Sequence, residues 1–358
     1  AEWPLPLCAL ILVIGWLCKP ALSVATVSDS AIGIAFVAFF IGALLAAVAA
    51  TRHAEHLAVR FGEPYGTLML TLSAISLEIA TVVTVMLHNA DNPTFGRDTM
   101  FSVVMIVLNG IIGVALLAGG LRHHEQRYSL RGANAFLSLL IPLATLALIW
   151  PNVTVTTGGG TFSPVQKIFL IVMSLLLYAA FMVIQTRTHT SFFVAEGEPD
   201  HAHHPPSPHG WPWHATLLIV YLVLVVLTAK LFALPLETSV ARLGLPLTVA
   251  GLAVAVLVLA PEGIAAIRAA RFNQMQRAMN IGLGTALSTI ALTVPAILLI
   301  DIVSGRTAVL GLGAADTMLL VLTFAVSMLT FSSGRTYAMQ GLVHLLLFLS
   351  YIVLIFSP

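Results

Sequence analysis

Charged residues are scarce in this chain: 9% of its 358 residues are Asp, Glu, Lys or Arg. A soluble globular protein carries about a quarter. The net charge is only +1, which excludes the concentrated basic surface that nucleic-acid binding requires, so we expect no nucleic-acid partner. Cysteine is also rare. Cys8 and Cys18 both lie in the first apolar segment, ten residues apart, and that spacing on one helix does not indicate a disulfide.

Apolar residues, in contrast, are abundant: 59% of the chain is hydrophobic and the mean hydropathy is +1.00. Eleven apolar segments have the character of membrane-spanning helices. They cover residues 4–18, 30–51, 66–88, 99–120, 133–151, 164–186, 213–233, 246–268, 278–304, 313–332 and 338–357. A signal peptide is the alternative for the first, but its N-terminal flank has Glu2 and no basic residue. The chain is therefore predicted to be an all-α integral membrane protein with about eleven transmembrane helices in a lipid bilayer.

The sixteen Lys and Arg residues predict the orientation. Alternating the sides along eleven spans places ten of them on the side of the N-terminus and six on the other. Basic residues accumulate in cytoplasmic loops. The N-terminus is therefore predicted to be cytoplasmic and the C-terminus outside.

Two short stretches repeat. Residues 55–64 and 237–246 share Glu, Arg, Gly and Pro at the same four positions, and each opens a long apolar segment with a lone glutamate, Glu78 or Glu262. These segments are the third and the eighth. Because they are five apart, they cross the membrane in opposite directions, which indicates an inverted repeat.

Both glutamates are candidate ligands for a transported cation. An ionisable group at membrane depth is costly and is usually functional; a paired structural carboxylate is the alternative. Pro261 and Gly263 flank Glu262, so we expect a broken helix beside the carboxylate. Transporters build ion sites from such breaks.

Further oxygen ligands are predicted on the helices that follow each glutamate: Asn109 in the first half, and Thr285, Ser288 and Thr289 in the second. With the two carboxylates they form an all-oxygen set, which suits a hard cation such as Ca²⁺. The alternative is that the hydroxyls bond back to their own helix or to a neighbouring one. For His344, within the last segment, helix packing is favoured over proton relay.

The segment 191–212 is predicted to be a cytoplasmic linker rich in His, Pro and acidic residues. Such a polar, proline-rich composition is typical of disorder. Imidazole and carboxylate groups together can also bind a metal ion or titrate near neutral pH. The candidate regulatory residues are Glu196, Glu198, Asp200, His201, His203 and His204.

Three stretches closely resemble the bacterial calcium/proton antiporters of the ChaA type, in the cation/Ca²⁺ exchanger superfamily. They are 259–295, beginning Leu-Ala-Pro-Glu-Gly, 60–68, Arg-Phe-Gly-Glu-Pro-Tyr-Gly-Thr-Leu, and 331–336, Phe-Ser-Ser-Gly-Arg-Thr. The resemblance implies two inverted five-helix repeats, each with an acidic residue in its second helix. Glu78 and Glu262 fall on those positions. The superfamily's Gly-Asn-x-x-Glu signature is not intact, since Ala74, Ile75 and Ser76 precede Glu78.

The resemblance also implies an organisation and a location. The predicted parts are an extra N-terminal helix with its loop (1–29), the first repeat (30–190), the linker (191–212) and the second repeat (213–358). The location is the bacterial cytoplasmic (inner) membrane. Oligomerisation with copies of the same chain is left open.

The predicted function is secondary antiport of Ca²⁺, Na⁺ or K⁺ against protons, with export of Ca²⁺ favoured. A divalent cation or protons, but not both, can neutralise two buried carboxylates, and this competition is the minimum that antiport needs. A monovalent Na⁺/K⁺ antiporter is the first alternative. The second is an intramembrane enzyme using the glutamates as acid and base, which no nucleophile or metal motif supports. We expect a transporter with no cofactor and, lacking a nucleotide-binding loop, no ATP-driven pumping.

Overall fold

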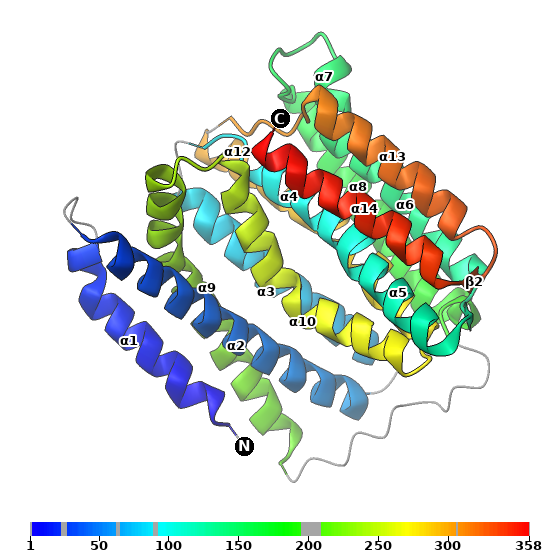
Figure 1. Ribbon diagram of the computed structural model, residues 1–358, viewed down its shortest axis with the longest axis horizontal. Coiled ribbons are helices and arrows are strands. Elements are labelled where there is room, and N and C mark those ends of the chain that lie inside the picture. Colours follow the sequence, from blue (N-terminus) through cyan, green and yellow to red (C-terminus); the bar gives the residue numbers. More distant parts are fainter. Residues whose placement is uncertain are drawn as a thin grey trace. The chain divides into compact units, whose positions relative to one another are not determined.

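The computed structural model describes residues 2–22, 27–61, 65–88, 92–194, 209–305 and 307–357 (Figure 1). In these ranges eight helices are long and apolar enough to cross a membrane, and three shorter helices are apolar as well. Each of the eleven overlaps one predicted segment, so the all-α membrane class is confirmed. How many of them span the bilayer stays a prediction.

The helices form two compact units, and the first comprises Ala1–Asn92 and Pro199–Pro261. Its helices are α1 (Pro4–Leu22), α2 (Asp29–Phe61), α3 (Tyr65–His88), α9 (Trp211–Arg242) and the first part of α10 (Thr248–Arg271). The long helix α2 packs against α1, α3 and α9. A side chain at Gly15 of α1 would place its Cβ 2.5 Å from the Phe39 ring of α2, so this close approach requires glycine.

The second unit comprises Pro93–Glu198 and Glu262–Pro358. A long helix with a π-helical turn in its middle lies at its centre: α4 (Phe95–Met105), η1 (Ile106–Ile111) and α5 (Ile112–His123). A second long helix also has a π-helical turn in its middle and consists of α11 (Met275–Ser288), η4 (Thr289–Thr293) and α12 (Val294–Ser304). The other elements are α6 (Leu130–Leu148), α7 (Trp150–Val153), α8 (Pro164–Val183), η2 (Ile184–Thr188), η3 (Thr190–Phe192), α13 (Ala314–Thr330) and α14 (Ala338–Phe356).

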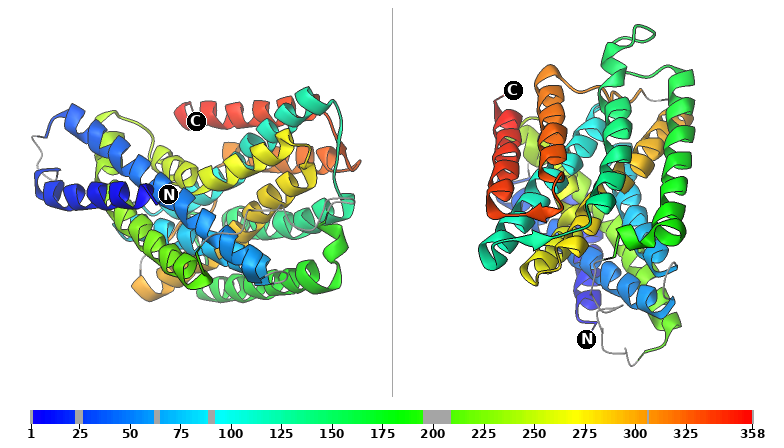
Figure 2. Two further views of the ribbon diagram at one scale, coloured as in Figure 1. Left: turned by 90° about the horizontal axis from the view of Figure 1, so that it is seen from below. Right: turned by 90° about the vertical axis from the view of Figure 1, so that its right-hand side faces the viewer.

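Two short strands connect the ends of helices in the second unit. β1 (Gln126–Arg127) pairs antiparallel with β2 (Arg335–Thr336), and Gln126 lies opposite Thr336. This pairing ties the α5–α6 connection to the α13–α14 connection. Figures 1 and 2 show α13 (orange) and α14 (red) side by side, with this strand pair at one end.

Local sequence explains where α6 and α8 begin. The Ser129 hydroxyl accepts a hydrogen bond from the Gly132 N–H at the start of α6. Ser163 forms a reciprocal capping box with Gln166 at the start of α8, and Pro164 occupies the first helical turn, where its missing N–H costs nothing. These caps define where two of the membrane helices of this unit start.

The outward faces of α8 and α14 are apolar, as a bilayer requires. The exposed apolar side chains of these two helices include Val165, Ile168, Phe169, Val172, Leu175, Leu176, Met339, Leu342, Leu346, Leu349 and Val353. In water so many exposed apolar side chains would drive association. It is instead suited to lipid acyl chains.

The compact units differ from the two repeats predicted from the sequence. Each unit takes helices from both halves: α1–α3 group with α9 and the start of α10, whereas α4–α8 group with α11–α14. The boundary falls between Pro261 and Glu262, inside α10. These units do not test the predicted repeats at 30–190 and 213–358, which stay a prediction.

Candidate functional site

The two predicted carboxylates lie in helices of different units. Glu78 is on α3 of the first unit and only 3% of it is exposed, which is unusual for an acid. Glu262 is on α10 and is partly buried. It is the first residue of Glu262–Pro358, which belongs to the second unit. The pairing of the two glutamates stays a prediction from the sequence.

Hydroxyl groups near Glu78 bond to their own helix. The Thr81 Oγ1 donates to the Leu77 carbonyl at 2.8 Å, and the Thr84 Oγ1 donates to the Ala80 carbonyl at 2.6 Å. This satisfies both hydroxyl protons within α3. Because donating the proton does not use the lone pairs of the hydroxyl oxygen, both hydroxyls can still accept hydrogen bonds or bind a cation.

The helix break predicted at Pro261 and Gly263 is wrong. α10 continues without interruption from Thr248 to Arg271, and Pro261 lies inside it. Proline removes one helical donor but leaves the neighbouring hydrogen bonds, so a membrane helix can run through it. A side chain at Gly263 would place its Cβ 3.1 Å from the Ile111 Cδ1. Gly263 therefore permits close contact with η1 instead of breaking the helix.

Backbone irregularity occurs on the following helices instead. The helix after Glu78 contains the π-helical turn η1, which includes Asn109, and the helix after Glu262 contains η4, which begins at Thr289. In such a turn each N–H bonds to the carbonyl five residues earlier, as the Ile112 N–H does with the Val107 carbonyl. Single π-helical turns are frequent at functional sites. Both contain residues that were predicted as ligands.

The sequence accounts for η4 better than for η1. Pro295 is in the first turn of α12, directly after η4, and its ring would collide with the carbonyl one turn earlier in a regular helix. The wider turn relieves that collision. Gly110 within η1 supplies backbone freedom, but no proline lies in or directly after η1. The sequence alone could therefore not have located this π-helical turn.

The predicted ligands of the second half lie along α11 and η4. Thr289 and Ser288 are buried, and Thr285 is partly buried. The Ser288 Oγ donates to the Thr285 carbonyl at 3.0 Å, so the alternative of back-bonding holds for this proton. Because the π-helical turn starts at Thr289, the helix is no longer regular from that residue to Thr293.

Asn109 is fully buried and contacts α13 and α14. Its Nδ2 donates to the Thr323 Oγ1 at 2.9 Å, and its Oδ1 lies 3.0 Å from the His344 Nδ1. α11 approaches a different part of the same helix, where a Cβ at Gly282 would lie 3.0 Å from Ile112. Cation binding by the second lone pair of the Asn109 oxygen stays a prediction.

Similarity to known proteins identifies the family. The sequence matches the sodium/calcium exchanger protein family over residues 30–187 and 213–357. The chain belongs to that family. The two matched segments each contain one of the two glutamates, as two copies of one repeat would.

Relatives of this exchanger are antiporters. It is 39% identical over 322 residues to the sodium-potassium/proton antiporter ChaA of Escherichia coli (strain K12), covering 88% of this chain and 87% of the relative. It is 24% identical to a Ca²⁺/H⁺ antiporter of Aphanothece halophytica, over 77% of this chain and 83% of the relative. Its fold matches that of the Ca²⁺/H⁺ antiporter YfkE with a TM-score of 0.74, at 17% identity over the whole of both chains. The exchanger is thus a multi-pass membrane transporter of the cation-antiporter class.

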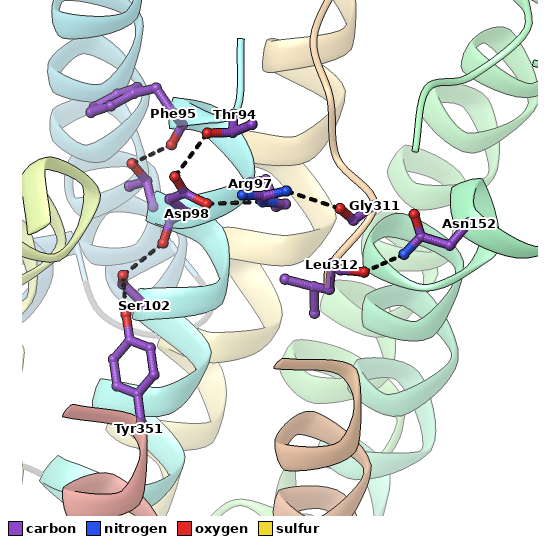
Figure 3. Close-up of polar contacts among 10 residues, drawn as sticks. Thr94, Phe95, Arg97, Asp98, Ser102, Asn152, Gly311, Leu312 and Tyr351 are labelled. Carbon is purple, nitrogen blue, oxygen red and sulfur yellow. Dashed lines mark hydrogen bonds and ion pairs between the residues drawn. The ribbon is translucent and has the colours of Figure 1, made fainter. Parts of the chain in front are cut away.

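Two further buried acids of the exchanger were missed in the sequence. Asp98 is 4% exposed and accepts hydrogen bonds from the Thr94 Oγ1 at 3.0 Å and the Arg97 Nε at 2.9 Å (Figure 3). Asp301 is 3% exposed, pairs with the Lys167 ammonium, and accepts from the Ala308 N–H at 2.7 Å. For Asp98 the adjacent Arg97 was a signal in the sequence, whereas Lys167 and Asp301 are 134 positions apart and no local pattern marks that pair.

Both acids stabilise the connection between α12 and α13, Asp301 directly and Asp98 through Arg97. The Arg97 Nη1 donates to the Gly311 carbonyl at 3.2 Å, and the Asn152 Nδ2 donates to the Leu312 carbonyl (Figure 3). The backbone N–H groups of Leu310 and Gly311 bond to the Gly160 carbonyl at 3.1 and 3.0 Å. Asp98 and Asp301 therefore have an architectural role that explains their burial.

The candidate regulatory residues of the linker, Glu196, Glu198, Asp200, His201, His203 and His204, lie outside the described residues. Within the ranges that the structure describes, no group of three or more His, Cys, Asp or Glu side chains is arranged to hold a metal ion.

A polar cluster joins Glu2 to two helices of the first unit. The Glu2 Oε2 accepts from the Arg52 Nη2 at 2.7 Å and from the Tyr221 hydroxyl at 3.2 Å, and it lies 3.3 Å from the His53 Nε2. The His53 Nδ1 in turn lies 2.9 Å from the His214 Nδ1. The cluster connects the residue before α1 to α2 and α9.

Replacing Glu2 should reduce stability in a pH-dependent way. Burial raises the pKa of the Glu2 carboxyl, but the charges of Arg52 and His53 and the hydrogen bonds from His53 and Tyr221 outweigh it, so the pKa lies below its ordinary value of 4.5. A lowered pKa stabilises the fold above 4.5, and the effect is lost as the pH falls through the folded pKa. Because the pair is partly exposed, we expect Glu2→Gln to cost only about 0.2–1 kcal/mol at neutral pH. Thermal unfolding of both proteins over a series of pH values below 4.5 checks this; a gap that does not shrink as the pH falls would contradict it.

Proposed function

We propose that this exchanger is a secondary active antiporter that exports Ca²⁺ in exchange for protons, with Glu78 and Glu262 as the metal-binding and proton-binding residues. The family match in two segments, each carrying one of these glutamates, is the observation that supports this most strongly. Its similarity to a Ca²⁺/H⁺ antiporter agrees with it. The substrates are inorganic ions and protons, so the proposal requires no cofactor.

Competition between the cation and protons is the physical basis of exchange. Two carboxylates in a low-dielectric environment cannot both remain charged without a partner. A divalent cation neutralises both at once, and protons do so one at a time. Since the two kinds of ligand exclude each other, each crossing in one direction carries the cation and each return carries protons.

The remaining oxygens would complete the coordination. Ca²⁺ takes about six to eight oxygen ligands, more than two carboxylates supply. Thr285, Ser288, Thr289 and Asn109 are the proposed additional ligands. The Ser288 hydroxyl already donates its proton to a backbone carbonyl. The lone pairs of the Ser288 Oγ are not used in that hydrogen bond and remain available to a cation.

Alternating access completes the proposal. Helices that run in opposite directions around one site present similar surfaces to both sides of the membrane, and exchange follows when one group of helices moves against another. The proposed location is the bacterial cytoplasmic membrane, with the N-terminus in the cytoplasm and the C-terminus outside. The linker at 191–212 is proposed to regulate transport from the cytoplasmic side.

Transport of monovalent cations is the second candidate. It is favoured by the 39% identity to an antiporter whose name specifies sodium and potassium. One carboxylate neutralises a monovalent ion, so such an antiporter would need only one of the two glutamates for charge balance. This difference makes the two candidates separable.

Proton movement in proteoliposomes tests the function. Purified exchanger is reconstituted into liposomes with an acidic interior that contains a pH-sensitive dye, and Ca²⁺, Na⁺ or K⁺ is added outside. We expect Ca²⁺ to raise the internal pH as it enters and protons leave. A response to Na⁺ and K⁺ alone would support the second candidate. No response to any of the three ions, from protein that is correctly folded, would contradict antiport.

A further inference from the structure

His344 lies on α14 at the place where the backbones of α14 and α5 are in close contact. A Cβ at Gly341 of α14 would lie 2.5 Å from the Leu117 N and 2.7 Å from the Gly113 carbonyl oxygen of α5. A Cβ at Gly120 of α5 would lie 2.4 Å from the Ala338 N. His344 follows Gly341 by one turn on the same face and has no exposed surface. The glycines thus bring the imidazole against the helix that carries Asn109.

Each ring nitrogen of His344 has a partner on another element. The Nδ1 lies 3.0 Å from the Asn109 Oδ1, and the Nε2 lies 3.0 Å from the Thr330 Oγ1. Both of these partners, the Asn109 amide and the Thr330 hydroxyl, are neutral groups. The centroid of the Phe331 ring lies 6.2 Å from the centroid of the imidazole. A neutral imidazole with one donor and one acceptor satisfies this arrangement.

The surroundings of Asn109 determine which nitrogen of His344 carries the proton. The Asn109 Nδ2 points to the Thr323 Oγ1, at 2.9 Å, and to the Met105 Sδ, at 3.5 Å. A thioether is only an acceptor, so the opposite orientation of the amide would place two acceptors together. The amide oxygen therefore faces His344, the Nδ1 donates to it, and the Nε2 accepts from the Thr330 hydroxyl.

This chain of hydrogen bonds holds the π-helical turn η1 from one side. Asn109 belongs to η1, and its side chain is fixed by Thr323 of α13 and His344 of α14. Ile111, also in η1, contacts Gly263, the residue that follows Glu262. The turn thus lies between the anchor formed by His344 and the helix that carries the second carboxylate.

We propose that His344 is a positioning residue for cation exchange: its hydrogen bond to Asn109 fixes η1, and η1 in turn fixes the segment of α10 that carries Glu262. This rests on the proposed function, in which Glu262 binds the cation. A buried, hydrogen-bonded residue that orients a ligand typically changes metal affinity about 10–100-fold when it is lost. His344 itself does not contact the cation.

Two polar replacements separate the roles of the ring nitrogens. His344→Asn keeps an N–H donor at the position of the Nδ1, and it can still bond to Asn109. His344→Gln places its amide at the position of the Nε2, where it can reach Thr330 but not Asn109. Ser350→Ala, at an exposed position of the same helix, is the control. Ca²⁺-dependent proton movement in proteoliposomes is measured as a function of Ca²⁺ concentration, and folding is checked by thermal unfolding.

We expect His344→Gln to raise the half-saturating Ca²⁺ concentration about 10–100-fold, whereas His344→Asn and the control stay close to the wild type. A wild-type value for His344→Gln would overturn the proposal, as would equal impairment of both His344 variants. If His344→Gln does not fold, Thr323→Val removes the other anchor of Asn109, and it should shift the same constant; an unchanged constant overturns the proposal.

Glu262→Gln is measured in parallel to separate two kinds of failure. If Glu262→Gln retains exchange, Glu262 does not bind the cation and the role proposed for His344 loses its basis. If Glu262→Gln is inactive while His344→Gln resembles the wild type, the cation site stands and only the role of His344 is wrong.

Discussion

Glu78→Gln and Glu262→Gln should each reduce Ca²⁺-dependent proton movement at least about 100-fold, although both proteins remain folded. Glutamine keeps the size of glutamate and can still form hydrogen bonds, but it cannot carry a negative charge or titrate. Each variant therefore lacks half of the charge that balances Ca²⁺. It also lacks a group that takes up a proton on the return crossing, so both directions of exchange fail.

Glu125→Gln is the matched control for this pair. Glu125 forms an ion pair with Arg335 at 3.1 Å on an exposed surface, with half of its side chain accessible. We expect it to leave exchange unchanged. Substantial Ca²⁺/H⁺ exchange in both Glu78→Gln and Glu262→Gln would contradict the site. Retention in only one of them would show that the glutamate replaced in that variant does not bind the cation.

Lys167→Met should reduce the free energy of unfolding by about 3–5 kcal/mol, the largest stability effect we expect in this chain. Lys167 pairs with Asp301, and the two side chains are 14% and 3% exposed. Removing the ammonium leaves the carboxylate buried without its counterion, and Asp301 also anchors the Ala308 N–H of the α12–α13 connection.

Arg335→Met gives the corresponding measurement for an exposed pair. Its partner is Glu125, and because water solvates both groups the loss should be at most about 1 kcal/mol. Denaturant unfolding in detergent compares the two variants under the same conditions. Equal losses in both would contradict the idea that Lys167 and Asp301 form a buried structural pair.

Much of the fold follows from the sequence because a bilayer restricts what an apolar segment can do. Each of the eleven predicted segments overlaps an apolar helix, and both glutamates lie within helices. Runs of apolar residues bounded by Gly, Pro and charge are sufficient for this, since the backbone must satisfy its own hydrogen bonds in lipid.

The failures concern features that depend on packing between distant parts of the chain. Pro261 predicted a break, yet α10 runs through it, while the irregular turns occur at Asn109 and Thr289. The Lys167–Asp301 pair joins residues 134 positions apart, and the Asn109–His344 contact joins residues 235 apart. No local pattern encodes such partners.

Proton release on Ca²⁺ binding tests the proposed site most directly. Ca²⁺ is added to purified exchanger in weakly buffered detergent solution, near the pH at which the empty site holds protons, and the released protons are titrated. Competition at Glu78 and Glu262 predicts release from the wild type that saturates with Ca²⁺, and none from the Glu78→Gln/Glu262→Gln double variant. Equal release from both proteins would contradict the paired-glutamate site.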